Sequence, residues 1–277
     1  MKKKLFAIIL AGVLAAGLAA CGGSGADKTD EKSSAAETAA SPVDDGVLTV
    51  GFDAEYPPFG YMDDNGEYTG FDLELAEAVC QMEGWTLEKK PINWDSKDLE
   101  LNSGAIDCIW NGFTINGRED DYAWSIPYVD NQQVVVVATG SGIEKLEDLA
   151  GKKVGVQAAS AALTALLEGH AELTDSFEVL SEFADYNTAF TELKAGALDA
   201  LAIDIGVANY QIANRGEGFE IMAESLQNEQ YGVGFALGQQ ALADLISADL
   251  EKLAADGTIA ALGEKYDISD MLAFDGE

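Results

Sequence analysis

Two charged residues of opposite sign follow apolar, strand-like runs of the sequence, Arg118 after an intervening polar stretch and Asp204 directly, and together they could hold a small zwitterion. Arg118 closes the stretch Asn111–Arg118, and Asp204 directly follows the run Ala197–Ile203. A guanidinium can grip a carboxylate through two parallel hydrogen bonds, although an ordinary surface ion pair is the simpler interpretation of Arg118. An acid at a strand end can pair with an ammonium group, or can only cap the helix that comes after it. The pair suits a ligand with an α-carboxylate and an α-ammonium group.

Two further loops carry polar and aromatic side chains. The loop Asp53–Phe59 contains two prolines, which stiffen a segment that presents Tyr56 beside Asp53. Such a loop is either a rigid surface turn or one wall of a site for a small polar molecule. The loop Gln157–Ala161 leads into a helix whose free N–H groups attract an anion, and Ser160 is expected to cap that helix in either case.

The sequence carries no signature of covalent or metal chemistry. His170 is the only histidine, no Ser or Cys forms a nucleophile motif with it, and no CxxC pair occurs. We therefore expect no metal, no cofactor and no enzymatic activity. Cys80 and Cys108 fall in apolar runs and are expected as buried thiols, although two cysteines of an exported protein could also pair.

One local pattern occurs twice and predicts how the charged residues are positioned. LNSGAIDCIW (Leu101–Trp110) and LKAGALDALA (Leu193–Ala202) both read Leu-x-x-Gly-Ala-(Ile/Leu)-Asp. A Gly after a helical stretch is typical of a left-handed helix stop, and the apolar run after it is typical of a buried strand. Two such joints in two strand–helix series predict two similar α/β lobes with mostly parallel sheets. A ligand is then expected in the cleft between the lobes, near the carboxyl ends of strands.

Hydrophobic periodicity and turn residues predict the main elements. Strands are expected over 48–52, 134–138, 152–156, 177–180, 197–203 and 231–237, and helices over 71–83, 142–151, 160–169, 185–196 and 241–266, the last broken at 256–257.

The N-terminus predicts export. Three lysines precede the apolar run Leu5–Ala20, and Leu18-Ala19-Ala20-Cys21 closes it, which resembles a bacterial lipobox. We expect residues 1–20 to be a lipoprotein signal peptide and Cys21 to carry a lipid such as palmitate, although a plain signal peptide is the alternative. Residues 21–45 then form a flexible tether, rich in Gly, Ser, Ala, Thr and acids, to a membrane-anchored domain.

The charge of the chain excludes one class of partner. The formal net charge is −33 at pH 7. Nucleic acid is therefore not expected as a partner, because phosphates call for Lys and Arg. Anionic lipid head groups should also repel so acidic a domain, so it is not expected to lie on the membrane surface. The simplest explanation for most of the charge is solubility.

From Leu48 to Tyr266 the chain resembles the solute-binding proteins of ABC importers for polar amino acids, the glutamine-, histidine- and arginine-binding group of family 3. The matching stretches, in the family's order, are LTVGFDAEYPPFGY, GEYTGFDLELAEAV, LNSGAIDCIWNGFTINGRED, WSIPYVDNQQVVVVA, LEDLAGKKVGVQ, LKAGALDALAIDIGVANY and EQYGVGFAL. The resemblance implies a two-lobed α/β fold of the type II periplasmic-binding-protein-like kind, with two crossover hinge strands. It places lobe I at 46–129 plus 232–277, lobe II at 134–226, and the crossings near 129–133 and 227–231.

The resemblance also assigns roles in ligand binding. Asp53 and Tyr56 would face the ligand side chain, and Trp94 would form the opposite wall. Gly112 would give a backbone contact and Thr114 a hydroxyl contact, and Arg118 would bind the carboxylate. From lobe II, Gln157 and Ser160 would contribute contacts and Asp204 would bind the ammonium. Three departures bear on these roles. The stretch Thr114–Arg118 is one residue shorter than is common in the family, Ala159 and Ala161 flank Ser160 in place of glycines, and Trp110 and Asn111 replace smaller residues, which could reshape the pocket.

The expected function is that of a lipid-anchored monomer on the extracytoplasmic face of a bacterial membrane. It would capture a polar L-amino acid and hand it to the permease of an ABC importer. Asp53, with Glu55 nearby, favours a ligand with an amine, guanidinium or amide, so a cationic amino acid, glutamine and cystine all stay open. The alternatives are an exported dehydratase-like enzyme on the same fold and an extracellular ligand-sensing domain.

Overall fold

The computed structural model describes residues 43, 45–216 and 218–274, and the structural statements below refer to these residues. These described residues form one compact unit. The predicted signal peptide 1–20, the lipidated Cys21 and most of the tether 21–45 lie outside the described residues, so these three assignments stay predictions. Within the described part, no helix has the length and apolar character needed to cross a bilayer.

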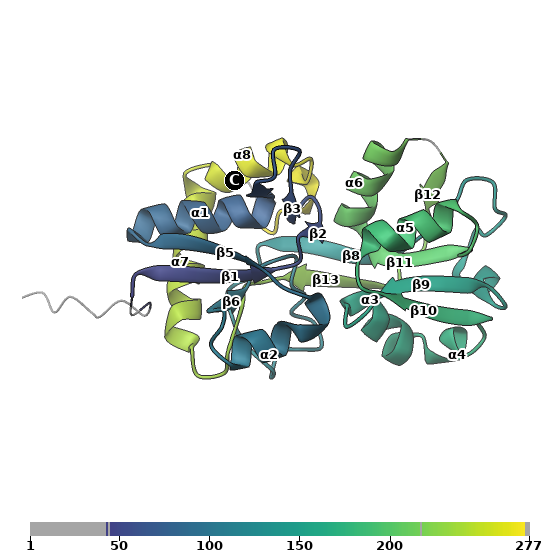
Figure 1. Ribbon diagram of the computed structural model, residues 1–277, viewed down its shortest axis with the longest axis horizontal. Coiled ribbons are helices and arrows are strands. Elements are labelled where there is room, and N and C mark those ends of the chain that lie inside the picture. The colour runs from purple at the N-terminus through teal and green to yellow at the C-terminus, as the bar shows by residue number, and fades with distance from the viewer. Residues whose placement is uncertain (1–42, 44, 217, 275–277) are drawn as a thin grey trace, which may run out of the picture. The chain divides into compact units, whose positions relative to one another are not determined.

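A five-stranded sheet organises the first lobe (Figure 1). Its order is β5-β1-β6-β14-β7; β5 and β6 pair parallel with β1, and β14 pairs antiparallel with β6 and β7. The elements of this lobe are β1 (Val47–Phe52), α1 (Phe71–Glu83), β5 (Thr86–Pro91), the 3₁₀ turn η1 (Trp94–Ser96), α2 (Lys97–Asn102), β6 (Cys108–Ile109), β7 (Ala123–Trp124), β14 (Gly234–Phe235), α7 (Gln240–Ala255), α8 (Thr258–Lys265) and the 3₁₀ turn η4 (Ser269–Met271). A small antiparallel sheet of β2 (Glu55–Tyr56), β3 (Gly60–Met62) and β4 (Tyr68–Thr69) adjoins it.

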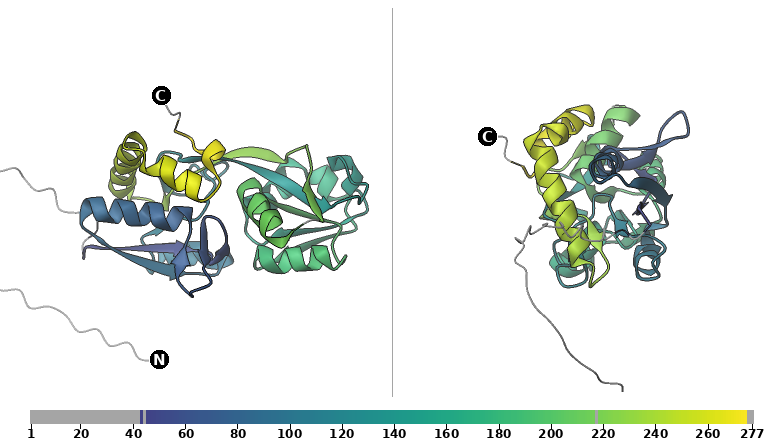
Figure 2. Two further views of the ribbon diagram at one scale, coloured as in Figure 1. Left: turned by 90° about the horizontal axis from the view of Figure 1, so that it is seen from above. Right: turned by 90° about the vertical axis from the view of Figure 1, so that its left-hand side faces the viewer.

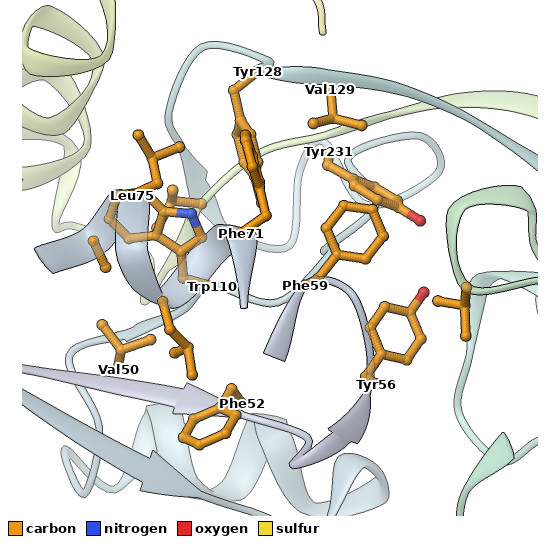
Figure 3. Packing of buried hydrophobic residues seen from close by; sticks show 14 of the residues in the cluster. Val50, Phe52, Tyr56, Phe59, Phe71, Leu75, Trp110, Tyr128, Val129 and Tyr231 are labelled. Atoms are coloured by element: carbon orange, nitrogen blue, oxygen red, sulfur yellow. The ribbon is translucent and has the colours of Figure 1, made fainter. Parts of the chain in front are cut away.

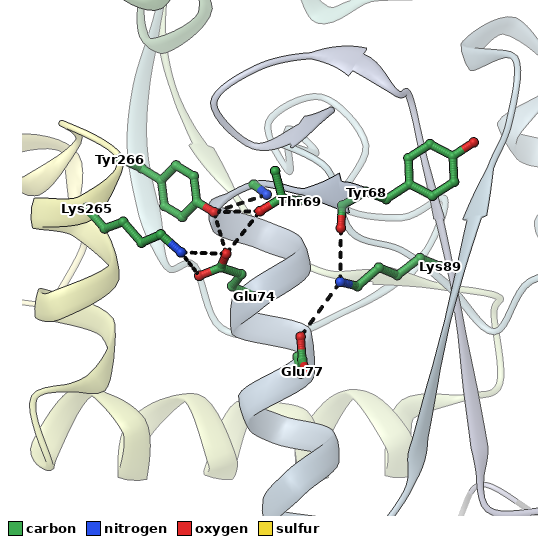
Figure 4. Close-up of polar contacts among 8 residues, drawn as sticks. Tyr68, Thr69, Glu74, Glu77, Lys89, Lys265 and Tyr266 are labelled. Atoms are coloured by element: carbon green, nitrogen blue, oxygen red, sulfur yellow. Dashed lines mark hydrogen bonds and ion pairs between the residues drawn. The ribbon is translucent and has the colours of Figure 1, made fainter. Parts of the chain in front are cut away.

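Helix α1 is fixed to both the small sheet and the C-terminal helices. It ends at Glu83, and Gly84 directly after it adopts the left-handed conformation typical of a helix stop (φ 71°). The carboxylate of Glu74 accepts hydrogen bonds from Lys265 Nζ (2.6 Å) and from the Tyr266 hydroxyl (2.7 Å), and Thr69 Oγ1 donates to it as well (3.0 Å; Figure 4). This network joins α1 to the end of α8 and to β4.

A six-stranded sheet organises the second lobe, in the order β10-β9-β11-β8-β12, with β13 also paired to β8. Strand β9 pairs parallel with β10 and β11, whereas β8 is antiparallel to β11, β12 and β13. The elements of this lobe are β8 (Val129–Ala138), the 3₁₀ turn η2 (Leu146–Leu149), β9 (Lys153–Gln157), α3 (Ala161–Thr164), the π-helical turn η3 (Ala165–Gly169), α4 (Ala171–Thr174), β10 (Val179–Phe183), α5 (Tyr186–Lys194), β11 (Ala200–Asp204), α6 (Ile205–Arg215), β12 (Phe219–Ile221) and β13 (Gln227–Tyr231).

Two strands run between the lobes, as the fold prediction required (Figure 2). The first half of β8 pairs antiparallel with β13, from Val129 opposite Tyr231 to Gln133 opposite Gln227. The remainder of β8 enters the second sheet, where Val134–Val137 are buried. One continuous strand therefore belongs to the hinge at one end and to a lobe core at the other.

The repeated pattern forms the same joint in each lobe. Gly104 after α2 and Gly196 after α5 are both left-handed, with φ of 73° and 74°. The aspartate three residues later bonds the neighbouring strand in the same way each time: the Asp107 carboxylate accepts the Thr49 N–H (2.7 Å), and the Asp199 carboxylate accepts the Lys153 N–H (2.8 Å). The joints thus lock β6 beside β1 and β11 beside β9, so the loop after each strand begins at a fixed position in its lobe.

Three element predictions differ from the structure. The helix predicted over 142–151 forms only the 3₁₀ turn η2, over Leu146–Leu149. The stretch 231–237, predicted as one strand, is divided between β13 and β14, because Gly232 and Gly234 pack closely against the Ile115 and Phe113 side chains where the chain leaves the hinge. The helix predicted over 160–169 is α-helical only over Ala161–Thr164 and then widens into η3.

Aromatic residues fill the first lobe beside the cleft (Figure 3). Phe59 lies between Tyr56 and Tyr231, with ring centroids 5.9 Å and 5.3 Å away, and all three are buried. Cys80 and Cys108 are buried free thiols, which was the default expectation for both.

Candidate functional site

A small cavity between the lobes brings together the predicted site residues of both. Its volume is about 10 Å³. It is lined by Tyr56, Trp94, Asn111, Gly112, Thr114, Arg118, Gln157, Ser160, Ala161 and Asp204. Of the predicted residues only Asp53 is missing from this wall, and it borders an adjoining hollow of about 420 Å³ that shares Trp94. The structure therefore places the predicted residues at one location.

The loop after β6 is held rigidly by buried polar contacts. Asn111 Oδ1 accepts the Asp53 N–H (2.9 Å), and the Asp72 carboxylate accepts the Gly112 N–H (2.5 Å). Gly112 has φ of 56°, and a Cβ placed there would lie 2.8 Å from the Tyr56 ring. Only glycine fits this position without strain, because the backbone is left-handed and the aromatic wall is close.

Arg118 reaches the cavity despite the shortened stretch before it. The backbone turns back on itself, with the Arg118 N–H donating to the Ile115 carbonyl (2.9 Å). The guanidinium lies over the Phe113 ring, 5.2 Å from its centroid, and donates to the Thr114 carbonyl (3.3 Å). No ion pair involves Arg118 anywhere in the described part of the chain. The guanidinium therefore lines the cavity without an anionic partner among the described residues.

Asp204 does not cap the helix after it, which makes the interpretation as a cap alone wrong. It occupies the N-cap position of α6, yet its side chain accepts no cap hydrogen bond. Instead its Oδ1 accepts from Asn131 Nδ2 (2.9 Å), Gln133 Nε2 (2.6 Å) and the Tyr231 hydroxyl (2.6 Å). Burial raises the pKa of Asp204 to about 7, with the nearby charge of Glu229 acting in the same direction.

Glu229 is a hinge residue of this site that sequence reasoning missed. It is 3% exposed, and its Oε1 accepts from Thr114 Oγ1 (2.9 Å) and from the same two amides, Asn131 Nδ2 (2.8 Å) and Gln133 Nε2 (2.8 Å). The available signal was two polar stretches, DNQQ at 130–133 and QNEQ at 227–230. Alternation puts Asn131 and Gln133 on one face of β8.

The second lobe contributes Gln157 and Ser160. Gln157 Nε2 donates across the cleft to Asp53 Oδ2 (2.6 Å), and burial raises the pKa of Asp53 to about 6. Ser160 caps α3 as predicted, accepting the Leu163 N–H (3.1 Å) and donating to the Gln157 carbonyl (2.8 Å). Ala159 adopts φ of 54°, so the loop keeps a glycine-like conformation although it has an alanine there.

Lys97 is a second residue that the sequence did not reveal. It begins α2, is 4% exposed, and places its ammonium over the Trp94 ring at 5.2 Å from the centroid. Its Nζ donates to the Ala159 carbonyl of the second lobe (3.3 Å). A lysine on a short amphipathic helix is ordinarily solvated, so burial here depends on the lobe opposite.

Comparison with known proteins identifies the family. The chain matches the model of the bacterial extracellular solute-binding proteins, family 3, over residues 48–268. The chain belongs to this family. The resemblance noted in the sequence is thereby confirmed.

Individual relatives of this family 3 protein differ in the ligand that they are named for. An L-cystine-binding protein of Escherichia coli (strain K12) is 30% identical over 229 residues, which cover 82% of this chain and 84% of the relative. A substrate-binding protein of an ABC uptake transporter from Streptococcus pneumoniae, solved with bound histidine, superposes with a TM-score of 0.80 at 31% identity, covering 83% of this chain and 96% of that one.

A third similarity concerns the enzyme alternative. An ancestral amino-acid-binding protein described as a precursor of cyclohexadienyl dehydratase has a TM-score of 0.73 at 30% identity, covering 80% of this chain and 96% of that one. These neighbours confirm the two-lobed type II fold for the family 3 protein described here.

Proposed function

We propose that this protein captures a polar L-amino acid between its lobes and delivers it to the permease of an ABC importer. One observation carries the proposal: the cavity is lined by the Arg118 cation and by the buried acid Asp204, and neither forms an ion pair with a described side chain. A buried acid left without a counter-charge is costly, so it is kept where a ligand supplies one. An α-amino acid supplies this counter-charge, and a carboxylate for Arg118 as well.

Each end of the ligand has an assigned partner in this proposal. The Arg118 guanidinium takes the α-carboxylate, assisted by the N–H groups at the start of α3 and by the Thr114 hydroxyl, which would turn its proton from Glu229 to the ligand. The carboxylate of Asp204 takes the α-ammonium, with Glu229 as a second acid beside it. Tyr56 and Trp94 enclose the side chain. Asn111, Gly112, Gln157 and Ser160 complete the wall.

Binding requires the lobes to move apart and close again. The cavity of about 10 Å³ holds no more than about one water molecule, so an amino acid cannot enter while Gln157 bonds Asp53 and Lys97 bonds Ala159 across the cleft. The paired part of β8 and β13 is the element about which such a motion would occur.

The adjoining hollow indicates the ligand class. Asp53, Glu55, Asp95 and Asp185 border it together with Trp94. An amine, guanidinium or amide at the end of the ligand side chain suits these acids, so the candidate ligands are cationic amino acids, glutamine and cystine-like molecules. The relatives named for cystine and histidine support a polar ligand.

The predicted setting completes the proposal. The lipobox-like Cys21 would anchor a monomer to the outer face of the cell membrane, with residues 21–45 as the tether and the lobes divided at 46–129 plus 232–277 and 134–226. The activity is proposed to be binding and not catalysis. His170 is engaged with the Leu226 carbonyl (2.8 Å) and is not part of the cavity wall.

A thermal-shift panel tests the proposal directly. The purified mature chain is heated with each of the twenty amino acids, with ornithine and with cystine, and any hit is then measured by titration calorimetry. At least one polar amino acid should raise the melting temperature, because a ligand that binds only the folded state stabilises it. No shift with any of them would refute amino-acid binding, and turnover of a bound amino acid would favour the enzyme instead.

A further inference from the structure

The Lys97 ammonium is a buried cation of the cleft that the roles proposed above leave unexplained. It stands at the start of α2 in the first lobe and is 4% exposed. Its nearest aromatic neighbour is Trp94, which lines both the small cavity and the adjoining hollow. Lys97 therefore lies immediately behind a wall of the proposed ligand site.

This ammonium is only partly satisfied. It has three N–H donors, yet it makes one hydrogen bond, to the Ala159 carbonyl of the second lobe (3.3 Å). It forms no ion pair with any residue that the structure describes. Burial lowers the pKa of Lys97 to about 8; the Arg118 charge acts the same way, and Asp98 and Asp95 act against it. A cation so placed is stabilised by an incoming anion.

Lys97 and Arg118 together put two positive charges on one side of the cleft. The buried acids of the site come from different parts of the fold: Asp204 from the second lobe, Glu229 from the hinge strand β13, and Asp53 from the first lobe itself. A ligand with one carboxylate and one ammonium leaves part of the negative charge of these acids unbalanced. The positive charge of Lys97 balances this remainder, which would otherwise attract a cationic group on the ligand side chain. Glu55 and Asp95, which border the adjoining hollow, are exposed. Because water screens them, their charges act more weakly on a bound ligand than the charge of the buried Lys97 does.

We propose that Lys97 determines the charge class of the ligand. Its ammonium donates a hydrogen bond to the Ala159 carbonyl of the second lobe when the cleft is closed. Its positive charge, beside that of Arg118, makes the closed cleft favour net-neutral amino acids over net-cationic ones. The inference rests on the proposed amino-acid binding and narrows it. It predicts that a neutral polar ligand, such as an amide or a zwitterion with an uncharged side chain, is preferred to one with a guanidinium or a second ammonium.

The test compares ligands of nearly equal shape and different charge. Titration calorimetry measures L-glutamine, L-citrulline and L-arginine on the wild type, Lys97→Met, Lys97→Arg and Lys145→Met. Lys145 is a matched control, since it is exposed on the second lobe and its substitution removes the same charge. We expect Lys97→Met to shift the citrulline-to-arginine affinity ratio toward arginine by about tenfold, with Lys97→Arg and Lys145→Met close to the wild type.

The outcomes separate this inference from the proposed function. Binding of no amino acid by the wild type overturns both. Binding with a ratio that Lys97→Met leaves within about twofold overturns this inference alone, and so does an equal change in Lys145→Met. A role limited to folding would weaken all three ligands alike and leave the ratio unchanged.

A second measurement is made on the wild type, and the conservative variant Lys97→Arg serves only to assign one signal. The wild type is labelled with [¹³Cε]lysine and titrated by NMR with and without a saturating amino acid, with the Lys97 signal assigned from Lys97→Arg. Arrival of a carboxylate should raise the pKa of Lys97 from its depressed value. An unchanged titration of this signal on ligand binding would overturn the proposed role.

Discussion

Asp204 and Glu229, one from the end of β11 and one from the hinge strand β13, accept hydrogen bonds from the same two side-chain amides. Asn131 Nδ2 lies 2.9 Å from Asp204 Oδ1 and 2.8 Å from Glu229 Oε1. Gln133 Nε2 lies 2.6 Å and 2.8 Å from the same two atoms. The acid pair therefore joins the second lobe to the strand about which the lobes would move.

Removing the charge of Asp204 should weaken binding of α-amino acids. In Asp204→Asn the amide oxygen can still accept from Tyr231, but the ligand ammonium loses its counter-charge, and we expect a loss of about 2 kcal/mol or more. Calorimetry of the amino acid identified by the thermal-shift panel measures this. Asp130→Asn is the matched control, since Asp130 is an exposed hinge residue bonded only to Gln230 within the described chain. Equal affinity of the wild type for a deaminated analogue would contradict the pairing.

Affinity should rise with pH through the neutral range. Because the pKa of Asp204 is raised to about 7, part of the free protein carries a proton there at pH 7. A ligand ammonium favours the ionised carboxylate, so binding releases protons and is weaker below pH 7 than at pH 8. Calorimetry in buffers of different ionisation enthalpy counts the released protons. Asp204→Asn should abolish most of this release, and a release that persists in that variant would assign it to another group.

The same raised pKa should make Asp204 a destabilising residue in the ligand-free protein at high pH. Its folded-state pKa exceeds the ordinary value of 3.8, so the folded state binds more protons, and stability falls as pH rises from about 4 to above 7. Asp204→Asn should therefore raise the free energy of unfolding at pH 8 by about 1 kcal/mol or more, and by less at pH 5. Urea denaturation at the two pH values measures the difference; a gain equal at both would rule out ionisation as its cause.

Arg118→Ala should weaken binding by about 2 kcal/mol or more, because the α-carboxylate is left buried without its guanidinium partner. Lys89→Ala is a suitable control, since Lys89 lies in the first lobe, pairs with Glu77 at 3.7 Å and bonds the Tyr68 carbonyl (Figure 4), and it is not among the cavity-lining residues. Unchanged affinity in Arg118→Ala would refute the role assigned to Arg118, whatever Lys89→Ala does.

The sequence predicted those site residues whose signal is local. Asp204 and Gln157 directly follow apolar runs, and Arg118 closes the polar stretch after another. The Gly-Ala-x-Asp joint explains why two strands end at the cleft. The resemblance to a family supplied the remaining roles. The two series of strands and helices likewise predicted two lobes, since the hydrophobic periodicity and turn residues that indicate each element lie within that element's own stretch of sequence.

The residues that the sequence did not reveal depend on contacts between distant segments. Glu229 became a site residue only through the register of β13 against β8, which no local pattern specifies. Lys97 is buried because a carbonyl of the other lobe lies against it. The Asp204 carboxylate accepts hydrogen bonds from three side chains on other strands and none from the N–H groups of its own helix, and the sequence near Asp204 does not specify those distant donors.

Substituting two glycines, one outside the site and one in it, should distinguish the effect of backbone strain on stability from an effect on ligand binding. Gly104 and Gly112 both have positive φ, at 73° and 56°, but a Cβ on Gly104 would meet nothing within 4 Å, whereas on Gly112 it would lie 2.8 Å from the Tyr56 ring. Gly104→Ala should cost about 1 kcal/mol of stability and leave ligand affinity unchanged. Gly112→Ala should cost at least as much and also weaken binding about tenfold or more, because Tyr56 must move from the cavity wall. Thermal unfolding and calorimetry on both variants measure these effects, and equal affinities would show that the position of Tyr56 does not matter for binding.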